Sequence, residues 1–206
     1  MIIGILGAGK LGVTLAQLAV KAGYEVIVAG SGDAGKIALT VATLAPGATA
    51  ATSDEVARRA EVIILALPLS KFRALPGRAL AGKRVIDAMN YWWEVDGPRS
   101  ELLPDSESTS EAVQAFLPGS RVVKALSHMG YHHLHDETKP TGSENRKAIA
   151  IAGDDSSDVA VVVDIVDKLG FDAVILPTLE SGRVLEPGHP AFGANLTQKA
   201  LKKLLN

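Results

Sequence analysis

Three glycines near the start of the chain have the spacing of a dinucleotide-binding turn. Gly7, Gly9 and Gly12 form the pattern G-x-G-x-x-G within GAGKLG. Glycines at these places permit a tight bend, a close approach of the backbone to a pyrophosphate, and close packing of a helix on a strand. The pattern follows a short apolar run, Ile2–Leu6, and precedes a stretch with helical spacing, and this context makes it a specific signal.

The helix expected after this turn supplies free N–H groups and a partial positive charge, both of which favour a phosphate. We therefore expect a bound dinucleotide to contact Gly7, Gly9, Lys10, Leu11 and Gly12. The alternative is an ordinary turn between a strand and a helix in which the glycines coincide by chance.

A second turn, in the stretch IVAGSGDAGK, bears on which dinucleotide is bound. NAD-binding enzymes carry an acidic residue about 20 residues after the glycine turn, where it accepts hydrogen bonds from the ribose 2′-hydroxyl. Here that position falls at Gly30 or Ser31, and neither is acidic. A site without this carboxylate favours NADP(H), since a carboxylate would repel the 2′-phosphate.

The residues of this second turn could themselves hold a phosphate. The Ser31 hydroxyl and the N–H groups of Gly30 and Gly32 could form an anion-binding nest, and Lys36 could add a positive charge. Asp33 is close by and would favour NAD if it were a displaced acceptor for the ribose hydroxyl. The alternative is that Asp33 only caps a helix.

Short apolar runs alternate with segments of helical spacing along the chain. The runs predict strands at Ile2–Leu6, Glu25–Ala29, Thr49–Ala51, Val62–Leu67, Arg84–Ala88, Arg121–Leu126, Ala148–Ala152 and Asp172–Leu176. Helices are expected at Lys10–Ala22, Lys36–Ala45, residues 52–60, residues 108–117, Ser156–Leu169 and Pro190–Leu205. Two helices open with a capping box, Thr52 with Glu55 and Ser108 with Glu111.

Strands that alternate with helices give a parallel sheet covered on both faces. We therefore predict an α/β fold, a Rossmann-type doubly wound parallel sheet with a small C-terminal α/β extension. A chain of 206 residues suits a single domain, with a possible internal boundary near residue 120 where a smaller C-terminal subdomain would begin.

The composition excludes several classes of function. A net charge of −2 argues against nucleic-acid binding, and no apolar run approaches the ~20 residues that cross a bilayer. The chain has no cysteine, hence no disulfide, thiolate metal site or cysteine nucleophile, and it lacks the G-x-S-x-G motif of many hydrolases. The first strand begins too close to Met1 to leave room for a signal peptide, so we expect a cytoplasmic protein.

Residues that follow strands could form the walls of a ligand crevice, because ligands of such sheets bind beyond the carboxyl ends of the strands. Leu67 and Pro68 end one predicted strand and could line the path of the adenosine or the nicotinamide ribose. Asn90 follows a second predicted strand, Arg84–Ala88, and could bind an amide or a ribose hydroxyl. A purely structural role is the alternative for each.

A polar stretch, Ser127–Arg146, is predicted to be a loop of about 20 residues, a length that usually marks a functional or mobile segment. It holds four of the five histidines, namely His128, His132, His133 and His135. They could bind zinc or iron, contact an anionic substrate group, or have no role beyond solvation. We expect no metal, and His128, nearest the end of a strand, is the preferred substrate contact.

Three consecutive aromatic residues, Tyr91, Trp92 and Trp93, come directly after a predicted strand end. Such a cluster could stack on a flat ring, bury an interface, or pack in the core or between the subunits of a dimer.

The chain resembles the family of coenzyme F420-dependent NADP oxidoreductases. The resemblance rests on GILGAGKLG at the start, AGS after the second strand, ILALP (Ile64–Pro68), the block SESTSEAVQAFLPGSRVVKAL, AGDD (Ala152–Asp155) and SGRVLE (Ser181–Glu186). It implies a Rossmann domain with a small C-terminal part, often a homodimer, that binds NADP(H) and coenzyme F420. Hydride would pass between nicotinamide C4 and deazaflavin C5. The family's 2′-phosphate site usually reads Ser-Arg; here Ser31 matches and Gly32 replaces the arginine.

The sequence thus predicts an NADP(H)-dependent oxidoreductase with a small-molecule redox substrate, coenzyme F420 in the first instance. Direct hydride transfer needs two rings held face to face, about 3–3.5 Å apart, with water excluded, rather than an acid and a base. We therefore expect wall residues, with Pro68, Asn90 and His128 as candidates. The alternatives are an NADP-dependent reductase of a small carbonyl, flavin or ferric chelate, and a non-catalytic redox sensor that binds NADP(H).

Overall fold

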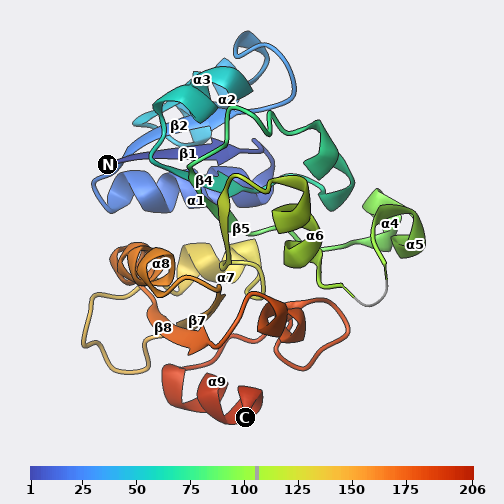
Figure 1. Ribbon diagram of the computed structural model, residues 1–206. Helices are drawn as coiled ribbons and strands as arrows, with labels where there is room; N and C mark the ends of the chain where they lie inside the picture. Colours follow the sequence, from blue (N-terminus) through green and yellow to red (C-terminus); the bar gives the residue numbers. More distant parts are fainter. Residues whose placement is uncertain (105–106) are drawn as a thin grey trace.

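The computed structural model describes residues 1–104 and 107–206, which form one sheet of eight strands with helices on both faces (Figure 1). The order of the strands is β3-β2-β1-β4-β5-β6-β7-β8. Their bounds are β1 Ile2–Leu6, β2 Glu25–Ala29, β3 Ala48–Ala51, β4 Val62–Leu65, β5 Arg84–Asp87, β6 Arg121–Lys124, β7 Ala148–Ala152 and β8 Asp172–Leu176. The predicted Rossmann-type fold is confirmed. Its switch in strand order lies between β1 and β4, where ligands of such sheets bind.

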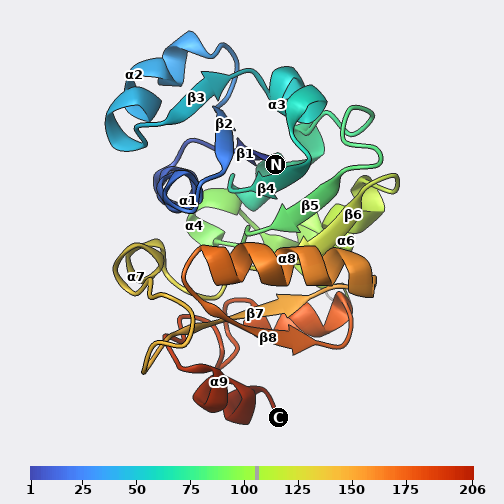
Figure 2. The same ribbon diagram turned by 90° about the vertical axis from the view of Figure 1, so that its left-hand side faces the viewer.

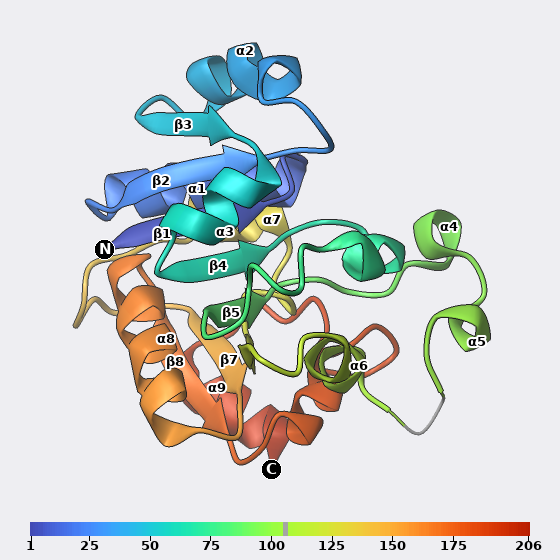
Figure 3. The same ribbon diagram turned by 45° about the horizontal axis from the view of Figure 1, so that its top comes forward.

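The described residues contain nine α-helices and two 3-10 helices, η1 and η2. They are α1 Lys10–Lys21, α2 Gly35–Leu44, α3 Ser53–Arg59, η1 Leu69–Ala74, α4 Trp93–Asp96, α5 Arg99–Leu102, α6 Thr109–Phe116, α7 Tyr131–Asp136, α8 Ser156–Lys168, η2 Glu180–Leu185 and α9 Gln198–Leu205. The short helices α4 and α5 project from the body of the molecule (Figure 3). Within the described residues, no helix combines the length and apolar character that crossing a bilayer requires.

Both predicted capping boxes are present. The Thr52 side chain accepts a hydrogen bond from the Glu55 N–H, and the Glu55 carboxylate accepts one from the Thr52 N–H. The bonds that the Glu55 carboxylate accepts from the N–H and the hydroxyl of Thr52 lower the pKa of Glu55. Ser108 and Glu111 make the same exchange at the start of α6. The block that begins at Ser106 is described except for Ser106 itself, which lies outside the described residues.

The two faces of the sheet bury different apolar clusters, because side chains alternate along each strand. Ile3 and Ile5 of β1 belong to the cluster that packs against α1 and α8. Ile63 and Leu65 of β4 face the opposite way, toward α3, η1 and α6. Gly4 lets α3 approach β1, since a Cβ at this position would lie 2.5 Å from Val56 Cγ1.

The expectation of a wholly parallel sheet is wrong at one junction. β7 runs antiparallel to β6, and a single residue pair, Lys124 opposite Ala152, joins them. An apolar strand pattern does not specify the direction of pairing, so the sequence could not indicate it. β7 and β8 are parallel to each other and are covered on one face by η2 and α9 (Figure 2). The domain boundary near residue 120 stays a prediction; the least-paired junction described in the sheet is β6–β7.

Two other predicted segments differ from the structure. Ser127–Arg146 is not entirely a loop, because α7 lies within it and packs against α1. Leu134 anchors this short helix, being fully buried. The terminal helix begins at Gln198 rather than Pro190, since residues 190–197 form turns and irregular structure, including a bridge between Lys147 and Thr197.

Candidate functional site

The glycine turn combines tight packing with one open position. Gly7 has φ +124°, and a Cβ on it would lie 2.1 Å from the carbonyl oxygen of Ala66. A Cβ on Gly12 would lie 1.8 Å from the Gly7 carbonyl oxygen, whereas one on Gly9 would meet nothing within 4 Å. Packing therefore requires Gly7 and Gly12 to be glycine, while Gly9 faces open space. Gly9 also begins α1 without a side-chain cap, which leaves N–H groups for a ligand.

The second turn follows β2 and leads into α2. Gly30 is packed, because a Cβ there would lie 2.8 Å from Ile37 Cγ2. Gly32 has φ +87°, a conformation that favours glycine, and the ammonium of Lys36 would be 3.6 Å from a Cβ at this position. Lys36 thus folds back over the turn. Ser31 is exposed beside it.

Asp33 has a local partner. Its carboxylate accepts a hydrogen bond of 2.7 Å from the Gly35 N–H, at the first residue of α2. Of its two expected roles, this geometry corresponds to the cap.

A cavity of about 510 Å³, here called the glycine cavity, lies between the two turns and the segment that follows β4. It is lined by Leu6, Gly7, Ala8, Gly9, Ala29, Gly30, Ser31, Gly32, Ser53, Ala66, Leu67, Pro68, Lys71, Ala74, Leu75 and Pro76. It brings together seven expected contacts from three separate segments of sequence. Lys10, Gly12 and Lys36 are not part of its lining. Lys71 was missed, because no sequence pattern predicted η1, which carries it.

A second cavity, here called the aromatic cavity, has a volume of about 360 Å³. It is lined by Leu11, Asn90, Trp92, residues 126–132, Phe192 and Gly193. Trp92 and Phe192 pack edge to face with their ring centroids 5.4 Å apart. Leu11 belongs to the first turn of α1, directly after the glycine turn, so the two cavities flank the start of the same helix. Trp93 lies outside both cavities and is 62% exposed, so core packing is wrong for this residue.

A buried ion pair holds the segment that carries Asn90. The Asp87 carboxylate accepts a hydrogen bond from the Met89 N–H at 2.9 Å, and the Lys124 ammonium donates to the Met89 carbonyl at 3.1 Å. Both charged side chains are fully buried, with Lys124 Nζ 3.6 Å from Asp87 Oδ2. Asp87 also accepts from the Ser110 hydroxyl. No sequence pattern indicates this pair, since the two residues lie in different apolar strands.

The same network continues from β6 to α6 and to the end of η2. Lys124 donates to the Thr109 hydroxyl at 3.3 Å, and the Glu186 carboxylate accepts from both the N–H and the hydroxyl of Thr109. Glu186 lies 3.9 Å from Arg99 and precedes the segment that ends in Phe192. Buried polar side chains therefore join β5 and β6 to α6 and to the residue that follows η2.

His128 lies deep beside this cavity. It is 1% exposed, and its Nε2 accepts a hydrogen bond of 3.0 Å from the Ala150 N–H. Burial lowers the pKa of His128 to about 4, with the Ala194 carbonyl opposing the shift. The ring is therefore neutral at pH 7 and supports β7. Its role as a substrate contact stays a prediction.

The other histidines of this segment lie on or beside α7. His132 lies against Gly130, and its ring centroid is 4.1 Å from that of His133. His135 pairs with Asp136 at 2.7 Å. Across residues 1–104 and 107–206, no group of three or more metal-ligating side chains is close enough to hold an ion.

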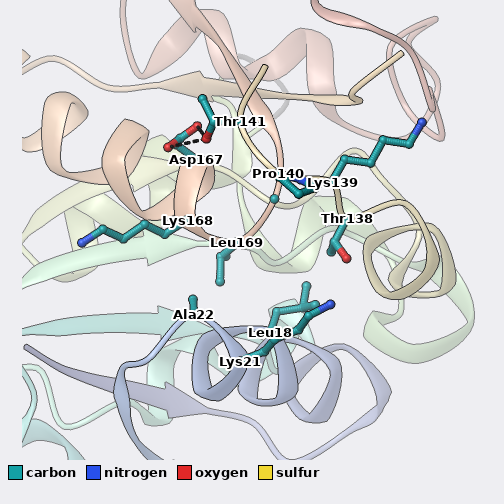
Figure 4. A pocket seen from close by; sticks show the side chains of 11 residues that line it. Leu18, Lys21, Ala22, Thr138, Lys139, Pro140, Thr141, Asp167, Lys168 and Leu169 are labelled. Carbon is teal, nitrogen blue, oxygen red and sulfur yellow. Dashed lines mark hydrogen bonds between the residues drawn. The ribbon is translucent and has the colours of Figure 1, made fainter. Parts of the chain in front are cut away.

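A third cavity, of about 430 Å³, lies between the end of α1, residues 138–141 and the end of α8 (Figure 4). The side chains of Lys139 and Lys168 point away from the hollow in this view. Asp167 is bonded to Thr141 and Arg146, and these bonds lower its pKa. The polar groups that line the third cavity do not point toward a common centre, so this cavity is a poor candidate for binding the nucleotide.

The N-terminal part of the chain is similar to a known family. Residues 2–91 match the family described as NADP oxidoreductase, coenzyme F420-dependent. This match confirms the resemblance predicted from the sequence over the segment that contains the glycine turn, the second turn and Asn90. No curated protein sequence matches the chain.

Solved structures show the same fold over most of the chain. A hypothetical protein, SMa0349 from Sinorhizobium meliloti, has a TM-score of 0.82 at 24% identity, with 96% of each chain covered. A protein from Arthrobacter sp. FB24, provisionally assigned as an F420-dependent NADP reductase, has a TM-score of 0.70 at 24% identity, with coverage of 88% of this chain and 86% of that one.

A more distant neighbour is the imine reductase from Myxococcus stipitatus in complex with NADP⁺. Its TM-score is 0.66 at 14% identity, and the match covers 90% of this chain but only 58% of the reductase. The family match over residues 2–91 supports an NADP oxidoreductase, and the solved structures show the shared fold.

Proposed function

We propose that this protein is an NADP(H)-dependent oxidoreductase that transfers hydride between nicotinamide and a second bound ring. The observation that carries the proposal is the arrangement of two cavities on either side of the first turn of α1. Gly9 lines the glycine cavity and Leu11 lines the aromatic cavity. A dinucleotide whose pyrophosphate lies over the start of α1 would extend its adenosine into the first and its nicotinamide into the second.

The second turn supports NADP(H) over NAD(H). Ser31 is exposed at the rim of the glycine cavity, and the Lys36 ammonium lies over Gly32, where it can replace the charge of the arginine usual in the family. The carboxylate of Asp33 is bonded to the Gly35 N–H and so is committed to the start of α2. The second turn therefore offers a 2′-phosphate the Lys36 ammonium, a hydroxyl and backbone N–H groups.

The aromatic cavity supports a flat second substrate, and the family match favours coenzyme F420. Trp92 and Phe192 supply aromatic surface, and His128 is neutral beside them. NADPH, when bound, supplies the hydride. The residues of this chain hold the two rings in contact and exclude water, and no proton need move, so the wall residues Pro68, Asn90 and His128 act by position.

An anaerobic stopped-flow assay with NADPH and oxidised F420, repeated with NADH, tests the proposal. We expect rapid reduction of F420 with NADPH and much slower reduction with NADH. Tight NADPH binding without turnover would discard the deazaflavin, and flavins, small carbonyls and ferric chelates would then be tried as acceptors. Binding without any acceptor would indicate a redox sensor, and absence of NADPH binding would overturn the proposal.

A further inference from the structure

The side-chain amide of Asn90 has a fixed orientation. Its Nδ2 donates a hydrogen bond of 2.5 Å to the backbone carbonyl of Ser127. A carbonyl oxygen can only accept, so the amide nitrogen must face Ser127 and Oδ1 must face the other way. Oδ1 is buried and has no hydrogen-bond partner among the described residues. The aromatic cavity is thus lined by a residue with a fixed, unused acceptor.

Ser127, which also lines this cavity, carries a second buried polar atom without a partner. The residue is 5% exposed, and its Oγ is buried with no hydrogen-bond partner in the described part of the chain. Ser127 follows Leu126, which is fully buried at φ +62°, a conformation that side chains other than glycine rarely adopt. Buried polar atoms without partners are uncommon in native proteins, because leaving them unpaired costs free energy. Three residues that line the aromatic cavity carry such an atom, since His128 Nδ1 is also buried without a partner among the described residues. Asn90 Oδ1 and Ser127 Oγ are the two that a ligand with a donor and an acceptor side by side would satisfy together.

The two atoms are complementary to a primary carboxamide. Asn90 Oδ1 can only accept, whereas the Ser127 hydroxyl can donate. A carboxamide offers an N–H donor and a C=O acceptor side by side. We propose that Asn90 Oδ1 accepts from the carboxamide N–H of the nicotinamide ring and that Ser127 Oγ donates to its C=O, which fixes the ring face presented to the second substrate. This inference rests on the proposed function and deepens it.

The position of the pair favours the nicotinamide over the second substrate. Asn90 and Ser127 are largely buried, whereas Trp92 is 48% exposed and lies at the outer side of the cavity. A substrate that enters and leaves in each cycle occupies the outer part, so the buried polar pair is left for the cofactor. Leu11, in the first turn of α1, connects this part of the cavity to the glycine turn.

Competition binding with a matched pair of nucleotides tests the inference. NADP⁺ and its 3-acetylpyridine analogue differ in that a methyl group replaces the amide NH₂, while the C=O remains. Each is used to displace NADPH from the purified full chain, with nicotinamide fluorescence as the signal. We expect the wild type to bind the analogue about tenfold more weakly, since the acceptor of Asn90 would then stay unpaired.

Two variants separate the two hydrogen bonds. Asn90→Leu, close in volume but without the acceptor, should bind both nucleotides with equal affinity. Ser127→Ala should weaken both by the same factor, a few-fold, and keep the tenfold discrimination, because both nucleotides carry the C=O. A purely structural role for either residue would not produce this crossed pattern.

The outcomes distinguish this inference from the function on which it rests. A wild type that binds NADPH tightly but does not discriminate between the two nucleotides overturns the carboxamide contact and leaves the oxidoreductase proposal in place. Discrimination that persists in Asn90→Leu overturns it as well. If Asn90→Leu does not fold, the carboxamide contact is tested by the ratio of the two nucleotide affinities in the wild type and by whether Ser127→Ala keeps that ratio. A chain that fails to bind NADPH at all overturns the proposed function instead.

Discussion

The glycine cavity and the aromatic cavity lie on either side of the same helix start, yet they are built from different parts of the chain. The first has its expected phosphate contacts on backbone, at two turns whose glycines stand close together in the sequence, and the segment after β4 completes its lining. The second is shaped by side chains from segments far apart, such as Asn90, Ser127 and Phe192. A backbone-built site suits a ligand group that many proteins bind, and a side-chain-built site can be adjusted to one particular partner.

The difference predicts that the two cavities fail in different ways. The glycine turn beside the first cavity should be lost when a side chain is added at Gly7 or Gly12, because packing leaves no room for a Cβ there. The aromatic cavity should be lost when a side chain is removed, because its walls depend on buried polar contacts. Both expectations can be measured.

The largest effect is expected at Gly12. Gly12→Ala places a Cβ 1.8 Å from the Gly7 carbonyl oxygen, so the turn must move, and we expect a loss of more than about 4 kcal/mol in the free energy of unfolding. Gly9→Ala is the matched control, because its Cβ meets open space: it should unfold like the wild type in urea but bind NADPH more weakly. Equal stability of both variants would contradict a backbone-built cavity.

The next largest effect is expected at the buried ion pair behind Asn90. Lys124→Met leaves the fully buried carboxylate of Asp87 without its counter-charge, which should lower the free energy of unfolding by about 3–5 kcal/mol. Urea titration followed by circular dichroism measures it. The double variant Asp87→Leu/Lys124→Met carries no buried charge and should recover part of the loss; a double variant as unstable as the single one would show that the charge is not the cause.

His128 should give the protein a pH-dependent stability. Its pKa is about 4 when folded and 6.5 when unfolded, so between these values the unfolded chain binds a proton that the folded chain does not. Stability should therefore fall by about 3 kcal/mol as the pH drops from 6.5 to 4, and change little through this group above 6.5. Unfolding midpoints across pH 4–8 measure this slope.

A variant without His128 identifies the source of that slope. His128→Gln keeps an acceptor for the Ala150 N–H but does not titrate, so its stability should be flat over the same range. Asp155 and Asp167 have their pKa lowered by hydrogen bonds from Ser157 and Arg146, and their contributions are lost mainly below pH 4. A slope that survives in the variant would exclude His128 as its origin.

The smallest effect is expected at the second turn. Ser31→Asp places a carboxylate at the rim of the glycine cavity, where it should repel a 2′-phosphate and weaken NADPH binding about tenfold or more, with NADH little changed. Ser31→Ala, which removes only the hydroxyl, should weaken NADPH a few-fold. Fluorescence titration with both nucleotides gives the ratios, and equal losses for NADPH and NADH would place the 2′-phosphate elsewhere.

Much of the fold could be predicted because it depends on local pattern. β1, β2, β7 and β8 have the predicted bounds, and both capping boxes form, since each depends on residues three apart. Errors fall where tertiary contacts decide. α7 forms in a polar stretch because Leu134 is buried against the body of the molecule, and α4, α5 and the 3-10 helices carry too few residues to show a period.

The candidate site divides in the same way. The residues of the glycine turn and the second turn could be named in advance, because a backbone conformation such as the φ of Gly7 selects residue type locally. Lys71 and Ser127 could not, because nothing adjacent in the sequence marks them.

The sequence by itself determined the Rossmann framework, the glycine turn and the lack of an acid at Gly30 and Ser31, all of which rest on residue type and short spacing. Only the tertiary structure decided that β7 runs antiparallel to β6, that Lys124 pairs with Asp87, and that Asn90 turns its amide nitrogen to Ser127. The physical reason is that burial and hydrogen bonding between distant segments depend on which strand ends meet. A sequence pattern indicates the strands but not which strand ends are in contact.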